Sequence, residues 1–163
     1  MSDATDAFNA LVGQLDYSMF IVTASAGGER AGCLVGFATQ SSIDPPRFLA
    51  CISRRNRTHE VAAHAVVLAV HFVPAAAAEL VELFGSHSGH DIDKFAQADW
   101  RPGPEAAAIL GACPNWFVGR VVERRGLGDH TGYLLEPVAA RCERSEEPFP
   151  FHRAKRYPPG REA

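Results

Sequence analysis

Residues 31–58 read AGCLVGFATQSSIDPPRFLACISRRNRT, and this stretch decides the fold. It begins as a strand of small residues, because Gly32, Gly36 and Ala38 leave room beside the backbone. The pattern fits a strand against which a flat ligand lies, and it fits equally a barrel corner where glycine permits a bend. Asp44-Pro45-Pro46 then interrupts the run, because proline cannot donate in a sheet ladder. Arg47–Ser53 follows as an apolar, buried strand.

The end of this stretch, SRRNRT at 53–58, combines three arginines, an asparagine and two hydroxyls directly before a predicted helix. Free N–H groups at a helix start and the guanidinium fork both suit a phosphate. The alternative is a solvated turn that needs only an N-cap, for which Thr58 is the candidate. Both readings remain open on the residues alone.

The pattern of the whole chain predicts one mainly β domain, residues 1–163, built as a six- to seven-stranded antiparallel barrel with helices packed outside. Apolar periodicity and turn signals mark the elements. The expected strands are 17–25, 30–40, 47–53, 66–73, 116–125, 130–143 and 149–152, and the expected helices are 4–15, 58–65 and 75–84.

Composition excludes several classes of function. The net charge of −3, without a run of Lys or Arg, gives no footprint for nucleic acid. No apolar run reaches the roughly 18 residues of a spanning helix, and the N-terminus lacks the pattern of a secretory signal. We therefore expect a cytoplasmic protein that does not enter a membrane. The four cysteines lie among apolar residues and are expected to be small buried hydrophobes.

Two motifs for other chemistries fail. HSGHDID at 87–93 contains metal-ligating residue types, but their spacing matches no closed site, so no metal is expected. No nucleophile elbow is present, which argues against a hydrolase of that class. No GxGxxG opens a helix after a strand. A nicotinamide nucleotide would therefore have to stack on another bound cofactor.

The order of the motifs resembles the flavin reductase family, the FMN-binding split-barrel proteins. The resemblance runs over about residues 15–157. Its segments are SSIDPP, RFLACIS, RRNRTHEV, VVLAVHFV, AAAAELVELFGSHSGHDIDKFA, WFVGRVVERRGLGDHTGYLLEPVAA and EPFPFHRAKRY. The chain departs from the usual pattern at 34–37, where it has LVGF instead of residues rich in Ser and Thr. Backbone contacts to a flavin ring would have to replace hydroxyl contacts there.

The resemblance implies FMN (or FAD) as cofactor and NAD(P)H as co-substrate. It places His130, after the turn Gly126–Asp129, beside the nicotinamide as the catalytic residue, although on pattern alone this histidine fits a turn that bonds Asp129 or the backbone. Lys94 and Phe95 would close over the cofactor. Ring and ribityl chain would lie along Gly36, Phe37, Thr39, Gln40, Ser41 and Ser42. The phosphate would lie at Ser53, Asn56, Arg57 and Thr58.

A small barrel has little interior room, so the flavin is expected on its outer surface with a second subunit covering it. The expected partners are thus a second copy in a homodimer, the flavin and nicotinamide nucleotides, and an oxygenase component that uses reduced flavin. The alternatives are a flavin-binding carrier or electron-transfer protein, a barrel without ligand that serves in assembly, and a related barrel that uses a deazaflavin.

Overall fold

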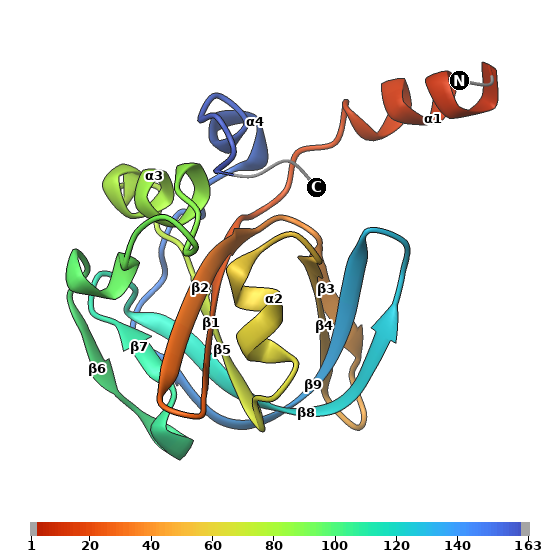
Figure 1. Cartoon of the computed structure of the whole chain (residues 1–163). Helices are drawn as coiled ribbons and strands as arrows, with labels where there is room; N and C mark the ends of the chain where they lie inside the picture. Colours follow the sequence, from red (N-terminus) through yellow and green to blue (C-terminus); the bar gives the residue numbers. More distant parts are fainter. Residues whose placement is uncertain (1–2, 161–163) are drawn as a thin grey trace.

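The computed structural model describes residues 3–160, which form one curved antiparallel sheet of seven strands in the order β2-β1-β5-β8-β9-β4-β3 (Figure 1). A two-stranded sheet, β6-β7, lies beside it. The mainly β, seven-stranded prediction is confirmed. The strands are β1 Phe20–Ala26, β2 Glu29–Val35, β3 Ala38–Ser42, β4 Arg47–Ser53, β5 Val67–Phe72, β6 Trp100–Pro102, β7 Ala108–Leu110, β8 Asn115–Gly126 and β9 His130–Cys142.

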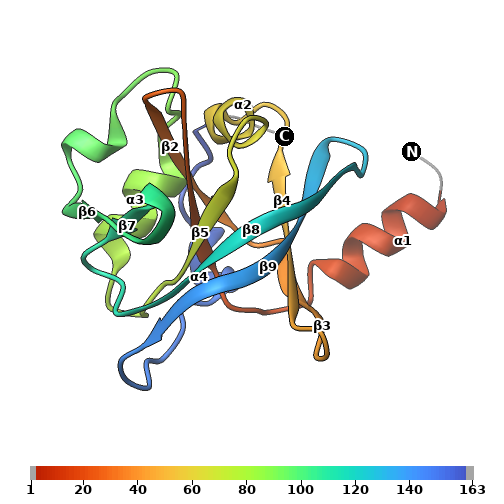
Figure 2. The ribbon, with the colours of Figure 1, turned by 90° about the horizontal axis from the view of Figure 1, so that it is seen from below.

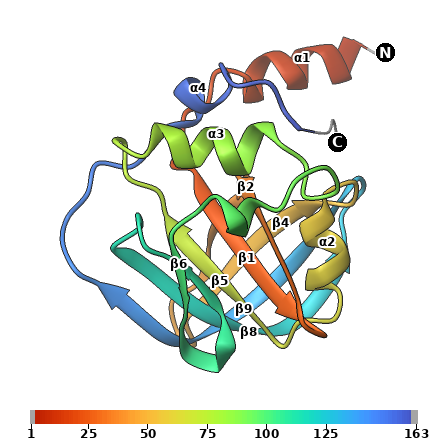
Figure 3. The ribbon, with the colours of Figure 1, turned by 60° about the vertical axis from the view of Figure 1, so that its left-hand side comes forward.

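Four helices accompany the sheet. They are α1 Asp3–Val12, α2 Arg57–Ala62, α3 Ala78–Ser86 and α4 Phe151–Ala154, with short 3-10 turns at Lys94–Ala96 and Pro104–Ala106. Helix α2 lies inside the curve of the sheet, and α3 and α4 lie outside it near one end (Figures 1 and 3). No helix within residues 3–160 is long and apolar enough to cross a bilayer.

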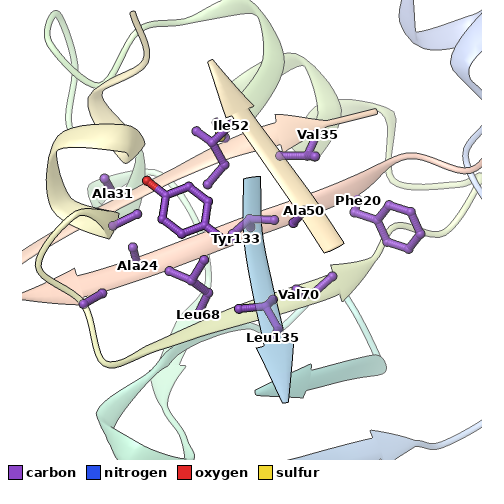
Figure 4. Packing of buried hydrophobic residues seen from close by; sticks show 14 of the residues in the cluster. Phe20, Ala24, Ala31, Val35, Ala50, Ile52, Leu68, Val70, Tyr133 and Leu135 are labelled. Carbon is purple, nitrogen blue, oxygen red and sulfur yellow. The ribbon is translucent and has the colours of Figure 1, made fainter. Parts of the chain in front are cut away.

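The core inside the curve is closed by α2. Tyr133 and Ile52 from two adjacent strands are fully buried there, together with Leu68 and Leu135 (Figure 4). Val61 of α2 packs against the same cluster. Burial of each large apolar side chain contributes roughly 1.5–3 kcal/mol, so this cluster holds the strands that carry the candidate site.

A second core lies on the other face of β1. Because side chains alternate along a strand, Phe20 and Val22 face the first cluster while Ile21 faces a second one. There Ile21 packs with Phe84 of α3 and with Phe149. Strand β1 is therefore covered on both faces, which explains why its first five residues, Phe20 to Ala24, are all buried.

The predicted strand 30–40 is wrong as a single strand. It divides after Val35: β2 pairs with β1, whereas β3 pairs with β4 at the opposite end of the sheet. Gly36 lies at the division, and a Cβ on it would come within 3.0 Å of the Tyr17 ring. A side chain at 36 would displace that ring. Glycine at position 36 therefore lets the chain pass the Tyr17 ring as it crosses from β2 to β3, at the opposite end of the sheet.

Three further expectations are corrected. Half of the predicted strand 149–152 lies in α4, because Pro150 forms only an isolated bridge to Ser18 and the helix begins at Phe151. Helix α3 begins at Ala78 and not at 75, because Ala75 N–H donates to Glu147 O at 2.8 Å. Helix α2 is capped by Asn56 and not by Thr58.

The cysteines also differ from the expectation. Cys33 and Cys113 are buried as predicted, but Cys51 is only half-buried and Cys142 is exposed at the end of β9. Cys142 is the last residue of β9 and pairs with Asn115, at the open end of the β8-β9 hairpin. It belongs to none of the hydrophobic clusters of the described residues. All four are free thiols.

Candidate functional site

The turn at 53–56 is held in one shape by its own polar groups. The Asn56 side-chain oxygen accepts the Thr58 N–H at 2.9 Å, and the Asn56 N–H donates to Ser53 O at 3.1 Å. The Arg54 N–H donates to Asp129 O at 2.9 Å. The turn after β4 is therefore fixed to the turn between β8 and β9, although the two are far apart in sequence.

His130 begins β9 directly opposite Ser53 of β4. Its Nδ1 lies 2.7 Å from the Asp129 carboxylate, which requires Nδ1 to carry the proton. This hydrogen bond lowers the pKa of Asp129. Within residues 3–160 no hydrogen bond is formed by His130 Nε2. The centroid of its ring lies 5.1 Å from that of the Phe37 ring.

Two adjoining hollows lie beside this turn, each of about 220 Å³. We call the first the His130 hollow; it is bounded by Tyr17, residues 33–37, residues 51–53 and His130. We call the second the Lys155 hollow; it is bounded by the end of α3 and by residues of the 151–160 segment. Five residues line both hollows: Met19, Leu34, Ser53, Asn56 and Phe151. We call the two hollows together the groove.

The structure brings together five of the residues that the sequence singles out. Gly36 and Phe37 form one side of the His130 hollow, at the crossing between β2 and β3. Ser53, Asn56 and His130 form another side, from the end of β4, the following turn and the start of β9. These residues come from three separate segments, so only the folded chain assembles them.

Four other predicted residues lie on β3, the edge strand that follows the groove. Thr39, Gln40 and Ser41 are exposed and Ser42 is half-buried. The Thr39 hydroxyl donates to Gln40 O, and the Gln40 amide donates to Ser42 O. None of the four lines the groove. Their contact with a flavin stays a prediction from the resemblance.

Arg57, Lys94 and Phe95 line a different cavity, of about 470 Å³, between the β1-β2 hairpin and residues 89–95. The Arg57 guanidinium lies 2.6 Å from Glu29 and 3.3 Å from Glu60. These carboxylates are the partners that an incoming phosphate would have to displace. Thr58 is fully buried and lines no described hollow.

Lys94 is a buried ammonium group that forms no ion pair with a carboxylate within residues 3–160. Its Nζ donates to Gly32 O at 3.0 Å and to Phe84 O at 3.1 Å. Burial lowers the pKa of this lysine. Phe95 packs against Phe84 and Trp100, with ring centroids 5.8 and 5.7 Å away. Both side chains thus join the loop 89–95 to the barrel and do not reach the groove.

Sequence reasoning missed the aromatic wall of the groove. Tyr17 and Phe151 stack with ring centroids 4.6 Å apart and an interplanar angle of 12°. Both line the His130 hollow, and Phe151 also lines the Lys155 hollow with Lys155 itself. The only signal was the aromatic content of EPFPFHRAKRY, which carries no information about its distant partner.

The groove fits a flavin on the chemistry of its lining. Its walls are apolar and aromatic, as the flat isoalloxazine ring requires, and Met19 and Leu34 supply two of them. The polar side chains of the His130 hollow are few and include Ser53, Asn56 and His130, and Lys155 lies in the adjoining hollow. The Asn56 side-chain oxygen already accepts the Thr58 N–H, so the NH₂ group of the same amide is the group that can donate to a ligand. A phosphate or a carbonyl edge suits such donors.

The sequence profile described as the flavin reductase like domain matches residues 12–160. The chain belongs to this family. An FMN reductase (NADH), RutF, from Methylorubrum extorquens is 27% identical over 136 residues, which are 82% of this chain and 66% of that protein. The stachydrine N-demethylase reductase subunit Stc3 of Rhizobium meliloti is 27% identical over 128 residues, 76% of this chain and 53% of Stc3. The chain thus spans less than two thirds of the length of each relative.

A solved structure shares the fold. The NADH:FAD oxidoreductase SgcE6 of Streptomyces globisporus C-1027 superposes with a TM-score of 0.82 at 23% identity, covering 93% of this chain and 91% of that chain. The same protein in complex with NAD and FAD fragments superposes with a TM-score of 0.79 at 22% identity, covering 99% and 93%. At this identity the likeness establishes the split-barrel fold.

Proposed function

We propose that this chain binds FMN or FAD in the groove and reduces it with hydride from NADH or NADPH. The observation that carries the proposal is the meeting of Ser53, Asn56 and His130 at one apolar hollow in a chain of the flavin reductase-like family. The names of RutF and SgcE6, reductases of FMN and of FAD, support the reaction class.

The bound flavin supplies the hydride chemistry, and the side chains of the groove bind and orient it. Ser53 Oγ and the Asn56 amide donate to the phosphate or ribityl oxygens. Gly36 and Phe37 form the surface on which the ring lies. The apolar walls exclude water from that surface, which strengthens each polar contact at the site.

His130 acts on the nicotinamide side. Asp129 fixes the proton on Nδ1, so Nε2 of the neutral ring accepts a hydrogen bond, whereas the protonated ring donates one there. Accepting the carboxamide N–H orients the nicotinamide. Donating to the reduced flavin stabilises its negative charge. Asp129 is a positioning residue in both cases.

Reduced flavin, or its electrons, then passes to an oxygenase component or another acceptor. The relative Stc3, a reductase subunit of a demethylase, supports this part of the proposal. A second copy of the chain covers the groove, because Phe37 at its edge is 58% exposed in the single chain.

A second candidate function is flavin binding for electron transfer without a nicotinamide reaction. The apolar run at 34–37 favours it, since side-chain hydroxyls that would tune the ring are absent there. Steady-state oxidation of NADH and NADPH with added FMN separates the two. Turnover excludes the carrier, whereas flavin binding without turnover excludes the reductase.

The experiment that tests flavin binding in the groove is a titration of FMN fluorescence with the wild type and two serine variants. Ser53→Ala removes a hydroxyl from the groove and should raise the Kd about fivefold or more, because a hydrogen bond to a charged group contributes about 1.5–3 kcal/mol. Ser145→Ala changes an exposed serine outside the groove and should leave the Kd unchanged. Equal affinities for all three proteins would place the flavin elsewhere.

A further inference from the structure

Helix α1 stands apart from the barrel in the part of the chain that the structure describes. None of its residues is buried, and it extends away from the barrel (Figures 1 and 2). Phe8, Leu11 and Val12 are 61%, 64% and 38% exposed and occupy one face of α1 at the spacing i, i+3, i+4, and Leu15, which is 56% exposed, follows the helix. An isolated helix of ten residues is marginal in water. The apolar face therefore requires a surface from outside the chain.

The base of this helix is fixed to the groove. A linker, residues 13–19, joins α1 to β1. Within this linker, Asp16 Oδ1 accepts the His152 N–H at 2.9 Å, which fixes the linker to α4. The next residue, Tyr17, stacks on Phe151 and forms a wall of the His130 hollow. The N–H groups of Gly13, Gln14 and Leu15 continue the helical turns down to this linker. Helix α1 is thus an arm of the molecule, and the linker at its C-terminal end is fixed beside the groove.

The groove has an apolar rim that the described chain leaves uncovered. Phe37 is 58% exposed and Leu127 is 48% exposed. Phe37 touches the His130 ring, and Leu127 lies in the same turn, with its N–H donating to His130 O at 2.8 Å. We define the rim by Phe37, Leu127 and the charged residues near them, which are Arg54 and Arg55 of the turn after β4, Glu123 and Arg125 at the end of β8, and Asp129 of the turn that follows.

The charges of arm and rim are complementary. The arm and its linker carry Asp3, Asp6 and Asp16, and no Lys or Arg occurs before Arg30. The charged residues of the rim are three arginines and two acids, which gives an excess of one positive charge. Acidic and basic surfaces that each surround an apolar patch attract and orient each other. Both surfaces belong to this chain, so a second copy presents the partner for each.

We propose that α1 docks on the rim of a second copy of this chain and closes that copy's groove. In a two-fold dimer the contact occurs twice, because each arm meets the other rim. The arm of one subunit then covers the open side of the flavin site of its partner. The inference rests on the proposed function for the identity of the ligand only, since the contact between arm and rim needs no flavin.

The test compares two double variants of α1 that add the same charge. Phe8→Asp with Leu11→Asp alters the apolar face, whereas Asn9→Asp with Ala10→Asp adds two acids outside it. Analytical ultracentrifugation gives the dimer Kd, FMN titration gives flavin affinity, and far-UV circular dichroism checks the barrel. We expect the wild type and the control to be dimers. The apolar-face variant should show at least a tenfold weaker dimer and at least a fivefold weaker affinity for FMN.

Two further variants keep the test decisive. A chain that begins at Leu15 lacks the arm without adding charge, and it should also lose dimer and flavin affinity. Leu127→Asp changes the rim and leaves the arm intact, and it should weaken the dimer equally. A monomeric wild type, or a dimer insensitive to the arm or to Leu127, overturns the proposal. So does a monomeric arm variant that binds FMN with wild-type affinity.

The outcomes also separate this inference from the proposed function. If the wild type binds no flavin but its dimer depends on arm and rim, the proposed function fails and the docking contact stands. If the wild type reduces FMN and the arm variants do so with unchanged dimer and affinity, the function stands and the docking contact fails.

Discussion

Ser53 and His130 lie directly opposite each other in the ladder between β4 and β9. This pairing puts the turn that we assign to the flavin phosphate and the histidine that we assign to the nicotinamide at one end of the same two strands. The two roles are therefore coupled through a rigid element, and the turns that follow are joined by the Arg54 N–H bond to Asp129 O. Substitutions at this end should separate flavin binding from flavin reduction.

His130→Asn should slow reduction of bound FMN by NADH about fivefold or more while FMN affinity changes less than about threefold. The reason is that Asn keeps a short polar side chain but cannot place a donor or acceptor where Nε2 lies, and one hydrogen bond contributes about 1 kcal/mol or more. Stopped-flow absorbance measures the rate. Asp129→Asn, which removes the orienting carboxylate, should give an intermediate rate. An unchanged rate in His130→Asn would remove this residue from the mechanism.

Asn56→Asp should weaken FMN binding about tenfold and leave the melting temperature nearly unchanged. Asp caps a helix as well as Asn does, but it replaces the NH₂ donor with a negative charge beside the phosphate. Asn56→Ala is the matched variant: it loses the cap, which costs about 1 kcal/mol, and the melting temperature should fall by a few degrees. If Asn56→Asp binds FMN like the wild type, the phosphate does not lie at this turn.

Acid should destabilise the fold through His71. This histidine is fully buried, its Nδ1–H donates to Ile21 O at 2.9 Å and its Nε2 accepts the Leu110 N–H at 3.1 Å. Burial lowers its pKa from 6.5 to about 4. Between these values the unfolded chain binds a proton that the folded chain does not, so stability falls as the pH drops from 6.5 towards 4. The full difference amounts to about 3 kcal/mol.

Urea unfolding at pH 7, 6 and 5 measures this dependence. His71→Gln should be less stable at pH 7 and should lose much of the slope with pH. His64→Gln, at an exposed histidine of the same region, should keep the slope of the wild type. A slope that survives in His71→Gln would assign the acid sensitivity to other groups.

The cysteines should react in order of exposure. Cys142 is exposed and should be labelled by a thiol reagent within seconds to minutes in the native protein. Cys113 should stay protected, because burial raises its pKa to about 12, and burial also raises the pKa of Cys33. Mass spectrometry of the labelled peptides identifies the sites. Cys142→Ser should abolish the fast phase, and early labelling of Cys113 would contradict its position in the core.

The sequence predicted the residues of the groove where local chemistry defines them. Ser53, Asn56 and His130 are polar residues at the ends of strongly apolar strands, so both their position and their segment could be recognised. The cap of α2 was misplaced by two residues because Asn56 and Thr58 are both good capping residues. Only the backbone bond from Thr58 to Asn56 decides between them.

Tertiary contacts decided what the sequence could not. The predicted strand at 30–40 divides at Gly36, and the Tyr17 ring occupies the space that a Cβ there would need. Lys94 was expected at the cofactor, yet two backbone carbonyls from β2 and α3 hold its ammonium group in the barrel wall. Arg57 was expected at a phosphate, yet Glu29 of the β1-β2 hairpin lies against it. None of these partners is near in sequence, so no local pattern reveals them.

The most direct test of the central claim is an absorbance spectrum of the purified protein with FMN, followed by anaerobic addition of NADH and then NADPH. The account predicts a shifted flavin band that travels with the protein on gel filtration and bleaches with one of the two nucleotides. Ser145→Ala should behave like the wild type, and His130→Asn should bind FMN but bleach slowly. A protein that binds no FMN or FAD, or a bound band that neither nucleotide bleaches, would contradict the proposed reductase.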